Sequence, residues 1–227
     1  MTLASCAALV EELERRYVVE TEMVTVGAHA VELIRPRSAE ELISEEDFAR
    51  DERLPYWAAL WPSAHPLAAR VMEEHGAGRS LLELGCGLGL VTIAAMRAGF
   101  AVLATDYYDD ALRFTRANAW RALGREPETR HVNWRDLPSD LGVFDRVVAA
   151  DVLYERPYGE LVAGVLARTL APDGLALIAD PGRVAVEAFL AACGARGLEV
   201  RETEERPYAA GNVRQTIRIY AIARIAI

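Results

Sequence analysis

The sequence predicts an α/β fold: a doubly wound, mostly parallel β-sheet with helices on both faces. Two observations predict this class. From residue 80 onward, short apolar segments alternate with longer amphipathic ones, a pattern typical of parallel strands joined by right-handed helical crossovers. The first apolar segment also runs into a glycine-rich turn, LLELGCGLGL at residues 81–90. In such a sheet ligands bind beyond the carboxyl ends of the strands, so the residues that end each strand are candidates for a functional site.

An N-terminal extension, residues 1–54, is expected to pack on the main domain, residues 55–227. The stretch MTLASCAALVEELERRY predicts an amphipathic helix. The segment YVVETEMVTVGAHAVELI, at residues 17–34, predicts a β-hairpin because two β-rich stretches flank Gly27. An acidic loop or helical stretch follows, through Arg53. The length of 227 residues suits one domain of this class and not two.

The main domain is expected to alternate strands and helices up to the end of the chain. Apolar runs predict strands at residues 81–84, 101–105, 129–132, 144–150, 175–179, 198–204 and 214–223. Helical periodicity predicts helices at residues 67–74, 88–98, 110–123, 158–170 and 184–196. Gly99 and Gly124 stand at helix C-cap positions. Asp109 or Asp110 can N-cap a helix, and Pro157 suits a first helical turn. Seven strands in this order predict a Rossmann-like sheet.

Composition argues against several classes of partner. The chain has 25 basic residues, all arginine, against 34 acidic ones, and its formal net charge of -9 would repel a nucleic-acid backbone. Three distant cysteines, Cys6, Cys86 and Cys193, predict a reducing compartment and no disulfide framework. The histidines show no metal-ligand spacing. The first residues lack the basic flank of a signal peptide, and apolar runs end before membrane-spanning length. We expect a cytoplasmic protein without nucleic acid, membrane or metal.

The glycine-rich turn indicates a nucleoside that carries no phosphates. Gly85, Gly87 and Gly89 give the spacing G-x-G-x-G, whereas a dinucleotide fingerprint requires G-x-G-x-x-G. Leu90 occupies the position of the third glycine in that fingerprint, and no Lys-Ser/Thr pair of a phosphate-binding loop follows. An ordinary tight turn is the alternative interpretation.

Two acidic residues accompany this turn. Glu83 lies within the preceding strand, and Asp106 ends the next strand in the segment ATD. Because the two strands are neighbours, a carboxylate at Asp106 would face the same crevice and could accept hydrogen bonds from both ribose hydroxyls. A helix cap is the alternative for Asp106. Cys86, inside the turn, is expected to be a small residue that fits the loop and not a nucleophile.

These motifs resemble those of a known enzyme family. LLELGCGLG and ATD resemble the first two motifs of class I S-adenosylmethionine (SAM) methyltransferases, whose cofactor has no phosphate. LPYWAALWPSAHP, DVLYE and IADPGR resemble the seven-β-strand protein-lysine methyltransferases, most closely those that modify the electron-transfer flavoprotein β subunit. The resemblance runs from about Pro55 to Arg183. It implies an enzyme that uses SAM to methylate a lysine ε-amine of a protein substrate.

The resemblance also implies roles for single residues. Trp61 would lie against the cofactor, Trp134 beside the adenine, and the motif from Asp151 to Tyr154 would face the substrate amine. Together with the glycine turn, the predicted cofactor-binding residues are Trp61, Glu83, Gly85, Cys86, Gly87, Asp106, Trp134 and Ala150. The predicted catalytic residues are Asp151 and Tyr154, and the predicted substrate contacts are Tyr56 and Trp57.

The chemistry of methyl transfer fits these residue types. The reaction is an in-line displacement that depends on positioning, and the amine must arrive neutral although its ammonium form dominates in water. Asp151 ends the strand FDRVVAAD and could orient the amine by hydrogen bonding. Tyr154 would add an aromatic wall, which suits the sulfonium and the methylated product because a cation–π contact contributes about 0.5–2 kcal/mol.

Structural interpretations of the same residues remain open. Trp57 and Trp61 are four apart and could pack one helical face against the core. Asp151 could cap the following turn, and Trp134 could be a core residue. The segment DPGR, residues 180–183, is expected to shape a turn. Two other functions also remain open: a SAM-dependent small-molecule methyltransferase and a noncatalytic SAM-binding module.

Overall fold

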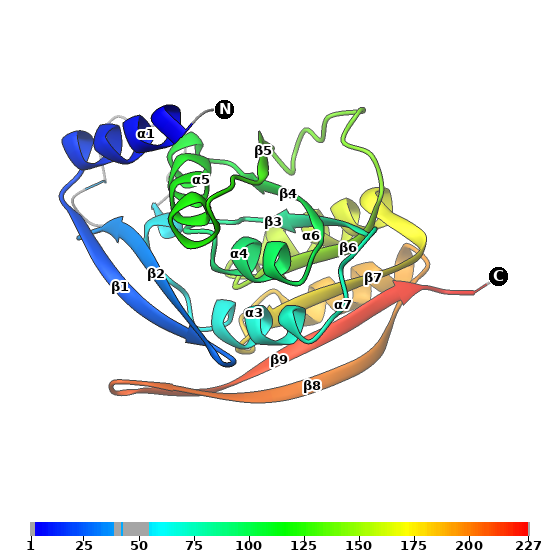
Figure 1. The fold of residues 1–227 in the computed structure, drawn as a ribbon. Helices are drawn as coiled ribbons and strands as arrows, with labels where there is room; N and C mark the ends of the chain where they lie inside the picture. The colour runs from blue at the N-terminus through cyan, green and yellow to red at the C-terminus, as the bar shows by residue number, and fades with distance from the viewer. Residues whose placement is uncertain (1–2, 39–41, 43–54, 227) are drawn as a thin grey trace.

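The computed structural model describes residues 3–38, 42 and 55–226. Most of the acidic stretch predicted through Arg53 therefore lies outside the described residues. Figure 1 shows a central sheet with helices in front of it and behind it, and a separate two-stranded hairpin beside the sheet. The α/β class predicted from the sequence is confirmed.

The central sheet has seven strands in the order β5-β4-β3-β6-β7-β9-β8. Its members are β3 (Ser80–Leu84), β4 (Ala101–Asp106), β5 (Glu128–His131), β6 (Phe144–Ala150), β7 (Leu170–Asp180), β8 (Leu198–Ala210) and β9 (Val213–Arg224). Strands β3 to β7 pair in parallel, and β9 pairs antiparallel with both β7 and β8. The strand order reverses between β3 and β6, which is the topological switch point where ligands bind in open α/β sheets.

Helices cover both faces of this sheet. They are α3 (Ala64–Met72), α4 (Leu90–Arg97), α5 (Asp109–Leu123), α6 (Arg156–Thr169) and α7 (Val186–Ala195). Alternating residues of each strand point to opposite faces: Leu81 of β3 packs with residues of α3 and α4, and Leu82 packs with residues of α6 and α7. Two apolar clusters, one on each face, therefore cover the sheet, and a third lies between α5 and the N-terminal elements.

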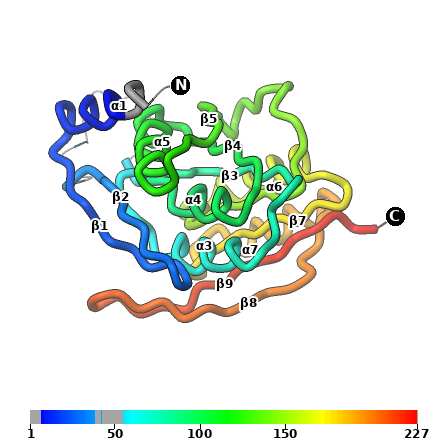
Figure 2. The backbone as a smooth tube through the Cα atoms, in the orientation of Figure 1, coloured from blue at the N-terminus to red at the C-terminus, as the bar shows by residue number. Residues whose placement is uncertain are grey.

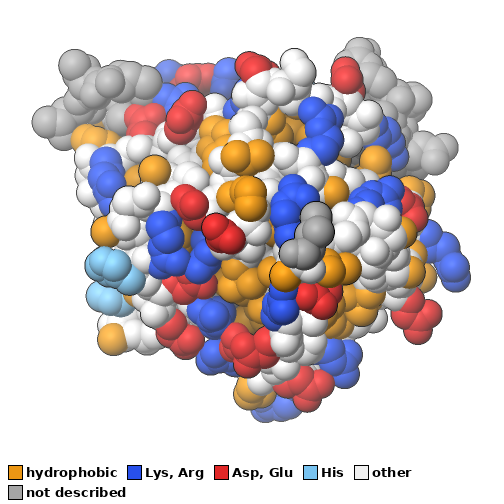
Figure 3. All heavy atoms as spheres, turned by 90° about the vertical axis from the view of Figure 1, so that its right-hand side faces the viewer, with side chains coloured by type: hydrophobic (Ala, Val, Ile, Leu, Met, Phe, Trp, Pro, Cys, Tyr) orange, Lys and Arg blue, Asp and Glu red, His pale blue; other side chains and the backbone are white. Residues whose placement is uncertain are grey.

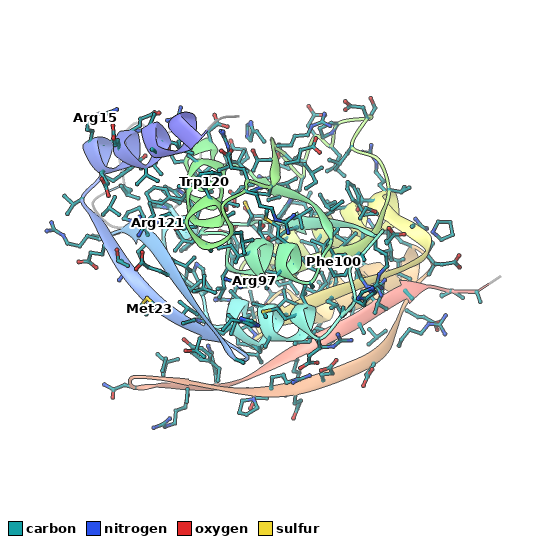
Figure 4. The ribbon with its side chains drawn as sticks, viewed as in Figure 1. Arg15, Met23, Arg97, Phe100, Trp120 and Arg121 are labelled. Carbon is teal, nitrogen blue, oxygen red and sulfur yellow. The ribbon has the colours of Figure 1, made fainter. Side chains whose placement is uncertain are left out.

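The N-terminal helix and hairpin pack on α5. They are α1 (Leu3–Arg16), β1 (Val19–Val26) and β2 (His29–Pro36). The side-chain amide of Asn118 in α5 donates to the carbonyl of Ile34 and accepts from its N–H, at 3.0 and 2.7 Å. Arg121, labelled on α5 in Figure 4, forms an ion pair with Glu32 of β2. Tyr17 donates to Asp110 at 2.5 Å, which ties the end of α1 to the start of α5.

The backbone trace in Figure 2 shows that the chain begins beside α5 and ends beyond β9, on the other side of the molecule. Figure 3 shows one face, on which acidic and basic side chains are interspersed. Among the residues that the structure describes, no helix is both long and apolar enough to cross a bilayer.

Two local predictions were wrong. Neither Asp109 nor Asp110 caps α5, because the N-cap is Tyr108 and both acids lie in the first turn. Trp57 and Trp61 do not share a helical face, because the helix there is a single 3-10 turn, η2 (Tyr56–Ala58), that ends before Trp61. Gly124 is the left-handed C-cap of α5, as predicted.

Candidate functional site

One pocket lies at the carboxyl ends of β3, β4 and β6 and contains every residue predicted for the site. Asp106 ends β4 and Asp151 follows β6, on either side of β3, and both line the pocket. The other predicted residues in its lining are Tyr56, Trp57, Trp61, Glu83, Gly85, Cys86, Gly87, Trp134, Ala150 and Tyr154. The strand ends thus bring together segments that are far apart in the sequence.

The glycine turn requires the glycines it contains. Gly85, Gly87 and Gly89 all have positive φ angles, of 71°, 51° and 84°, a region that residues with a Cβ rarely adopt. At Gly89 a Cβ would also lie 3.0 Å from the backbone Cα of Thr115 in α5. The close approach of α5 explains why α4 begins only at Leu90, two residues after the predicted start.

Replacing Gly89 with Ala is expected to destabilise the protein more than replacing Gly124. Both glycines have positive φ, and the left-handed conformation costs a non-glycine residue about 1–3 kcal/mol. Gly124 has nothing within 4 Å of its would-be Cβ, whereas Gly89 faces Thr115. Urea unfolding should give a larger loss for Gly89→Ala than for Gly124→Ala. Equal losses would mean that the approach of α5 does not constrain the turn.

Asp106 connects β4 to the glycine turn. Its Oδ2 accepts the N–H of Gly87 and its Oδ1 accepts the N–H of Tyr108, both at 3.0 Å. Burial raises the pKa of this carboxyl, and the backbone N–H groups oppose that shift. An ionised carboxylate can accept about four hydrogen bonds, so Asp106 can still accept from a ligand. It therefore fixes the turn and offers acceptor capacity in the same pocket.

Glu83 is a second buried carboxyl beneath the turn. It accepts a hydrogen bond from the hydroxyl of Thr92 in α4. Burial, reinforced by the nearby charge of Asp106, raises its pKa from 4.5 to about 8. Among the described residues, no arginine forms an ion pair with Glu83 or Asp106. The pocket thus contains two buried acids that a positively charged ligand would stabilise.

A row of aromatic side chains forms the opposite wall of the pocket. The ring of Tyr56 packs edge-on against Trp61, at 5.7 Å between centroids, and against Tyr154, at 5.1 Å. Tyr154 continues to Tyr158 at 4.6 Å, and Tyr158 to Trp134 at 5.8 Å. Tyr158 lines the pocket but is not among the residues predicted from the sequence. Its position four residues after Tyr154, in the first turn of α6, is the signal that could have identified it.

Trp57 lies mainly in the core. It is 8% exposed, and its ring packs against Phe114 of α5 and Tyr17 after α1. Its backbone carbonyl lies against the glycine turn, 3.2 Å from where a Cβ of Gly87 would stand. The ring of Trp57 therefore packs mainly in the core, and its backbone supports the glycine turn. Trp57 also lines the pocket, and its role as a substrate contact stays a prediction.

Asp151 has an unusual backbone and a fully engaged side chain. Its φ of 59° is the only positive value at a non-glycine residue within the described part of the chain. Its Oδ2 accepts the N–H of Ser63 at 2.8 Å, and its Oδ1 accepts both Nε and Nη2 of Arg183 at 2.9 and 2.7 Å. Asp151 can therefore accept a hydrogen bond from a substrate amine only through the remaining capacity of Oδ2.

The DPGR segment forms the predicted turn. Asp180 Oδ1 accepts the N–H groups of Gly182 and Arg183, at 2.7 and 2.6 Å. This turn directs Arg183 toward Asp151, a contact that was not predicted from the sequence.

Cys86 is a packing residue of the turn. It is buried, its Sγ accepts a hydrogen bond from the hydroxyl of Thr115 at 3.3 Å, and burial raises the pKa of its thiol. A protonated, enclosed thiol is a poor nucleophile. Within the described residues, no group of three or more His, Cys, Asp or Glu side chains is arranged to hold a metal ion.

Comparison with known proteins agrees with this geometry. Residues 82–178, from β3 into β7, match the sequence profile of a family described as "Methyltransferase domain". This part of the chain is similar to a methyltransferase domain. It includes the glycine turn, Asp106 and Asp151, so the matched residues contain most of the pocket.

Two curated relatives of this chain act on lysine, according to their names. The electron transfer flavoprotein beta subunit lysine methyltransferase of Danio rerio is 31% identical over 137 residues, 59% of this chain and 52% of its own length. The protein-lysine N-methyltransferase rrg1 of Schizosaccharomyces pombe is 27% identical over 193 residues, 76% of this chain and 64% of its own length. The chain thus spans between half and two thirds of each relative.

A solved structure shares the fold of this chain. It is the magnesium protoporphyrin IX methyltransferase of Synechocystis PCC 6803, determined with bound SAM. The TM-score is 0.57 at 17% identity, over 70% of this chain and 77% of that chain. At 17% identity, this comparison shows that the two proteins share a fold.

Proposed function

We propose that this protein is a SAM-dependent methyltransferase that methylates a lysine ε-amine of a protein substrate. The observation that carries the proposal is the single pocket that joins the glycine turn and Asp106 to Asp151 and Tyr154. Parallel strands place these groups at one rim of the sheet, where a nucleoside and an acceptor can meet. The names of the two curated relatives support lysine as the acceptor.

The residues present fit SAM. When bound, SAM supplies an electrophilic methyl group on a positively charged sulfonium. Asp106 would hold the ribose, and Glu83, which forms no ion pair with a described arginine, would be stabilised by the positive charge. Trp134 would contact the adenine, and Trp61 would offer its ring to the cation. The turn offers backbone N–H groups but no basic side chain for a phosphate.

The acceptor end of the pocket is formed by the chain's own aromatic and acidic groups. Tyr56 and Tyr154 pack against each other and would restrict a lysine side chain to one direction of approach. An apolar, aromatic surround disfavours the ammonium form of an amine, which lowers its pKa and increases the neutral fraction. Asp151, through the remaining capacity of Oδ2, would orient the amine.

Transfer of label from SAM to an acceptor tests the proposal. Purified protein with methyl-labelled SAM should label recombinant electron transfer flavoprotein β subunit, and should not label the same subunit after its lysines have been blocked by acetylation. A whole lysate, separated into protein and small-molecule fractions, should carry label in protein. Label confined to small metabolites would establish a small-molecule methyltransferase instead, and no label in either fraction would favour a noncatalytic SAM-binding module.

The affinity for SAM is expected to rise with pH through about 8. In the free protein the pKa of Glu83 is about 8, so Glu83 is largely protonated at pH 7, and a bound cation favours its ionised form. The α-amino group of SAM also titrates near pH 8. We would measure the Kd for SAM by calorimetry between pH 6.5 and 9, for the wild-type protein and for Glu83→Gln. The ionisation of the SAM amino group affects both proteins equally, so the difference between their Kd values at each pH reports the ionisation of Glu83.

The raised pKa of Glu83 also determines how the stability of the free protein depends on pH. Because the folded pKa of Glu83 lies above 4.5, the native state binds the extra proton, and stability without ligand should fall as pH rises from 4.5 toward 8. Glu83→Gln should flatten both pH profiles. Identical profiles for the two proteins would exclude a titrating Glu83.

A further inference from the structure

Arg183 connects three loops around the acceptor end of the pocket. It lies in the turn between β7 and α7, bonds the carboxylate of Asp151 after β6, and places its guanidinium over the ring of Trp61, 5.0 Å from the centroid. Arg183 itself is not part of the pocket lining. We propose that Arg183 is a positioning residue, which holds Trp61 and Asp151 in place without touching the ligands.

The backbone of Asp151 requires such a support. A non-glycine residue with positive φ persists only where its surroundings hold it. Here the side chain of Asp151 is 2% exposed and that of Arg183 is 26% exposed, so the ion pair is shielded from solvent on the side of Asp151. The N–H of Ser63 donates a hydrogen bond to the other carboxylate oxygen of Asp151. Asp151 is thereby fixed between the Trp61–Ser63 segment and the DPGR turn.

Trp61 is held on two sides. Its indole Nε1–H donates to the carbonyl of Tyr56 at 2.7 Å, and its ring face receives the guanidinium of Arg183. The Trp61 ring lines the pocket together with Tyr56 and Tyr154. A change at Arg183 would therefore reach the aromatic wall through Trp61, at the acceptor end and away from the contacts of Asp106 with the glycine turn.

The role requires a guanidinium and not only a positive charge. Arginine is planar, so it can stack on an indole while its N–H groups bond a carboxylate at the edge of the same plane. Lysine offers a compact charge that can pair with Asp151 but cannot stack on Trp61 as a plane. Arg183→Lys therefore keeps the positive charge beside Asp151 and removes the planar group that stacks on Trp61.

The experiment compares Arg183→Lys with Arg201→Lys as a matched control. Arg201 is half exposed and pairs with Glu199 of the same strand, β8. Proton–nitrogen NMR spectra report the indole N–H of Trp61, which is assigned with Trp61→Phe. The proposal predicts that Arg183→Lys shifts or broadens this resonance and that Arg201→Lys leaves it in place. An unchanged resonance in a folded Arg183→Lys protein would overturn the proposal.

A kinetic arm of the experiment rests on the proposed function. With electron transfer flavoprotein β subunit as acceptor, Arg183→Lys should lower kcat/KM by about tenfold or more, because small displacements at a reacting site are costly. The affinity for SAM, measured by calorimetry, should fall by less than kcat/KM does, because Trp61 also faces the cofactor but Asp106 and the glycine turn keep their contacts. The losses from Arg183→Lys and Trp61→Phe should not add in the double variant, because the residues act together.

The two arms separate the possible failures. Full additivity, or an equal loss of SAM affinity, would contradict a role at the acceptor end. Absence of methylation by the wild-type protein would reject the proposed function, and the NMR spectra would still decide whether Arg183 positions Trp61.

Discussion

Replacing Asp106 with Ala is expected to reduce the affinity for SAM by about 100-fold. The carboxylate would accept hydrogen bonds from the ribose hydroxyls, and hydrogen bonds to a charged group contribute about 1.5–3 kcal/mol each. The substitution also removes the acceptor that holds the N–H of Gly87, so the glycine turn loses its connection to β4. Calorimetric titration with SAM measures the effect.

Asp109→Asn is the matched control for Asp106→Ala. Asp109 is an exposed acid in the first turn of α5, three residues from Asp106, and it is not part of the pocket lining. This variant should bind SAM as the wild type does. If Asp106→Ala also bound SAM within about threefold of the wild type, the ribose would not lie at Asp106.

Replacing Asp151 with Asn is expected to lower kcat by about 100-fold, the order of effect that a displacement of about 1 Å can have at a reacting site. Asparagine has a similar size and tolerates positive φ, so the backbone at φ 59° can be kept. Its amide nitrogen cannot accept a hydrogen bond, so either Arg183 or the N–H of Ser63 loses its partner. Asp106 and the glycine turn are untouched, and SAM affinity should stay within about threefold.

Single-turnover methyl transfer measures this loss directly, with circular dichroism as the check that Asp151→Asn is folded. Asp173→Asn serves as control, because Asp173 is exposed near the start of β7, away from the pocket. Turnover at the wild-type level in Asp151→Asn would remove Asp151 from the reaction.

Much of the fold follows from the pattern of apolar residues. Strand β6 was predicted to the residue, because FDRVVAA ends in the apolar run VVAA directly before a strand-end acid. Strand β7 begins five residues before its predicted start, since LAPDG has the composition of a turn. It nevertheless pairs with β6 across a register shift, where Leu170 lies opposite Phe144. Charged residues hid the length of β8, which extends to Ala210.

The site residues that the sequence predicts are those at the ends of strands and those within short motifs. Asp106 and Asp151 follow parallel strands, and topology alone brings them to one rim. The contact of Arg183 with Asp151 depends on the direction of a side chain that leaves a turn 32 residues further along the chain, which no local pattern encodes. The same holds for Trp57, whose burial depends on Phe114 and Tyr17.

Titration of the wild-type protein with SAM and, separately, with NAD tests most directly whether this pocket binds a nucleoside without phosphates. The glycine turn, with Asp106 beside it and no basic side chain of its own for a pyrophosphate, predicts that SAM binds at one site and that NAD does not compete for it. Binding of NAD with no detectable binding of SAM would contradict the account.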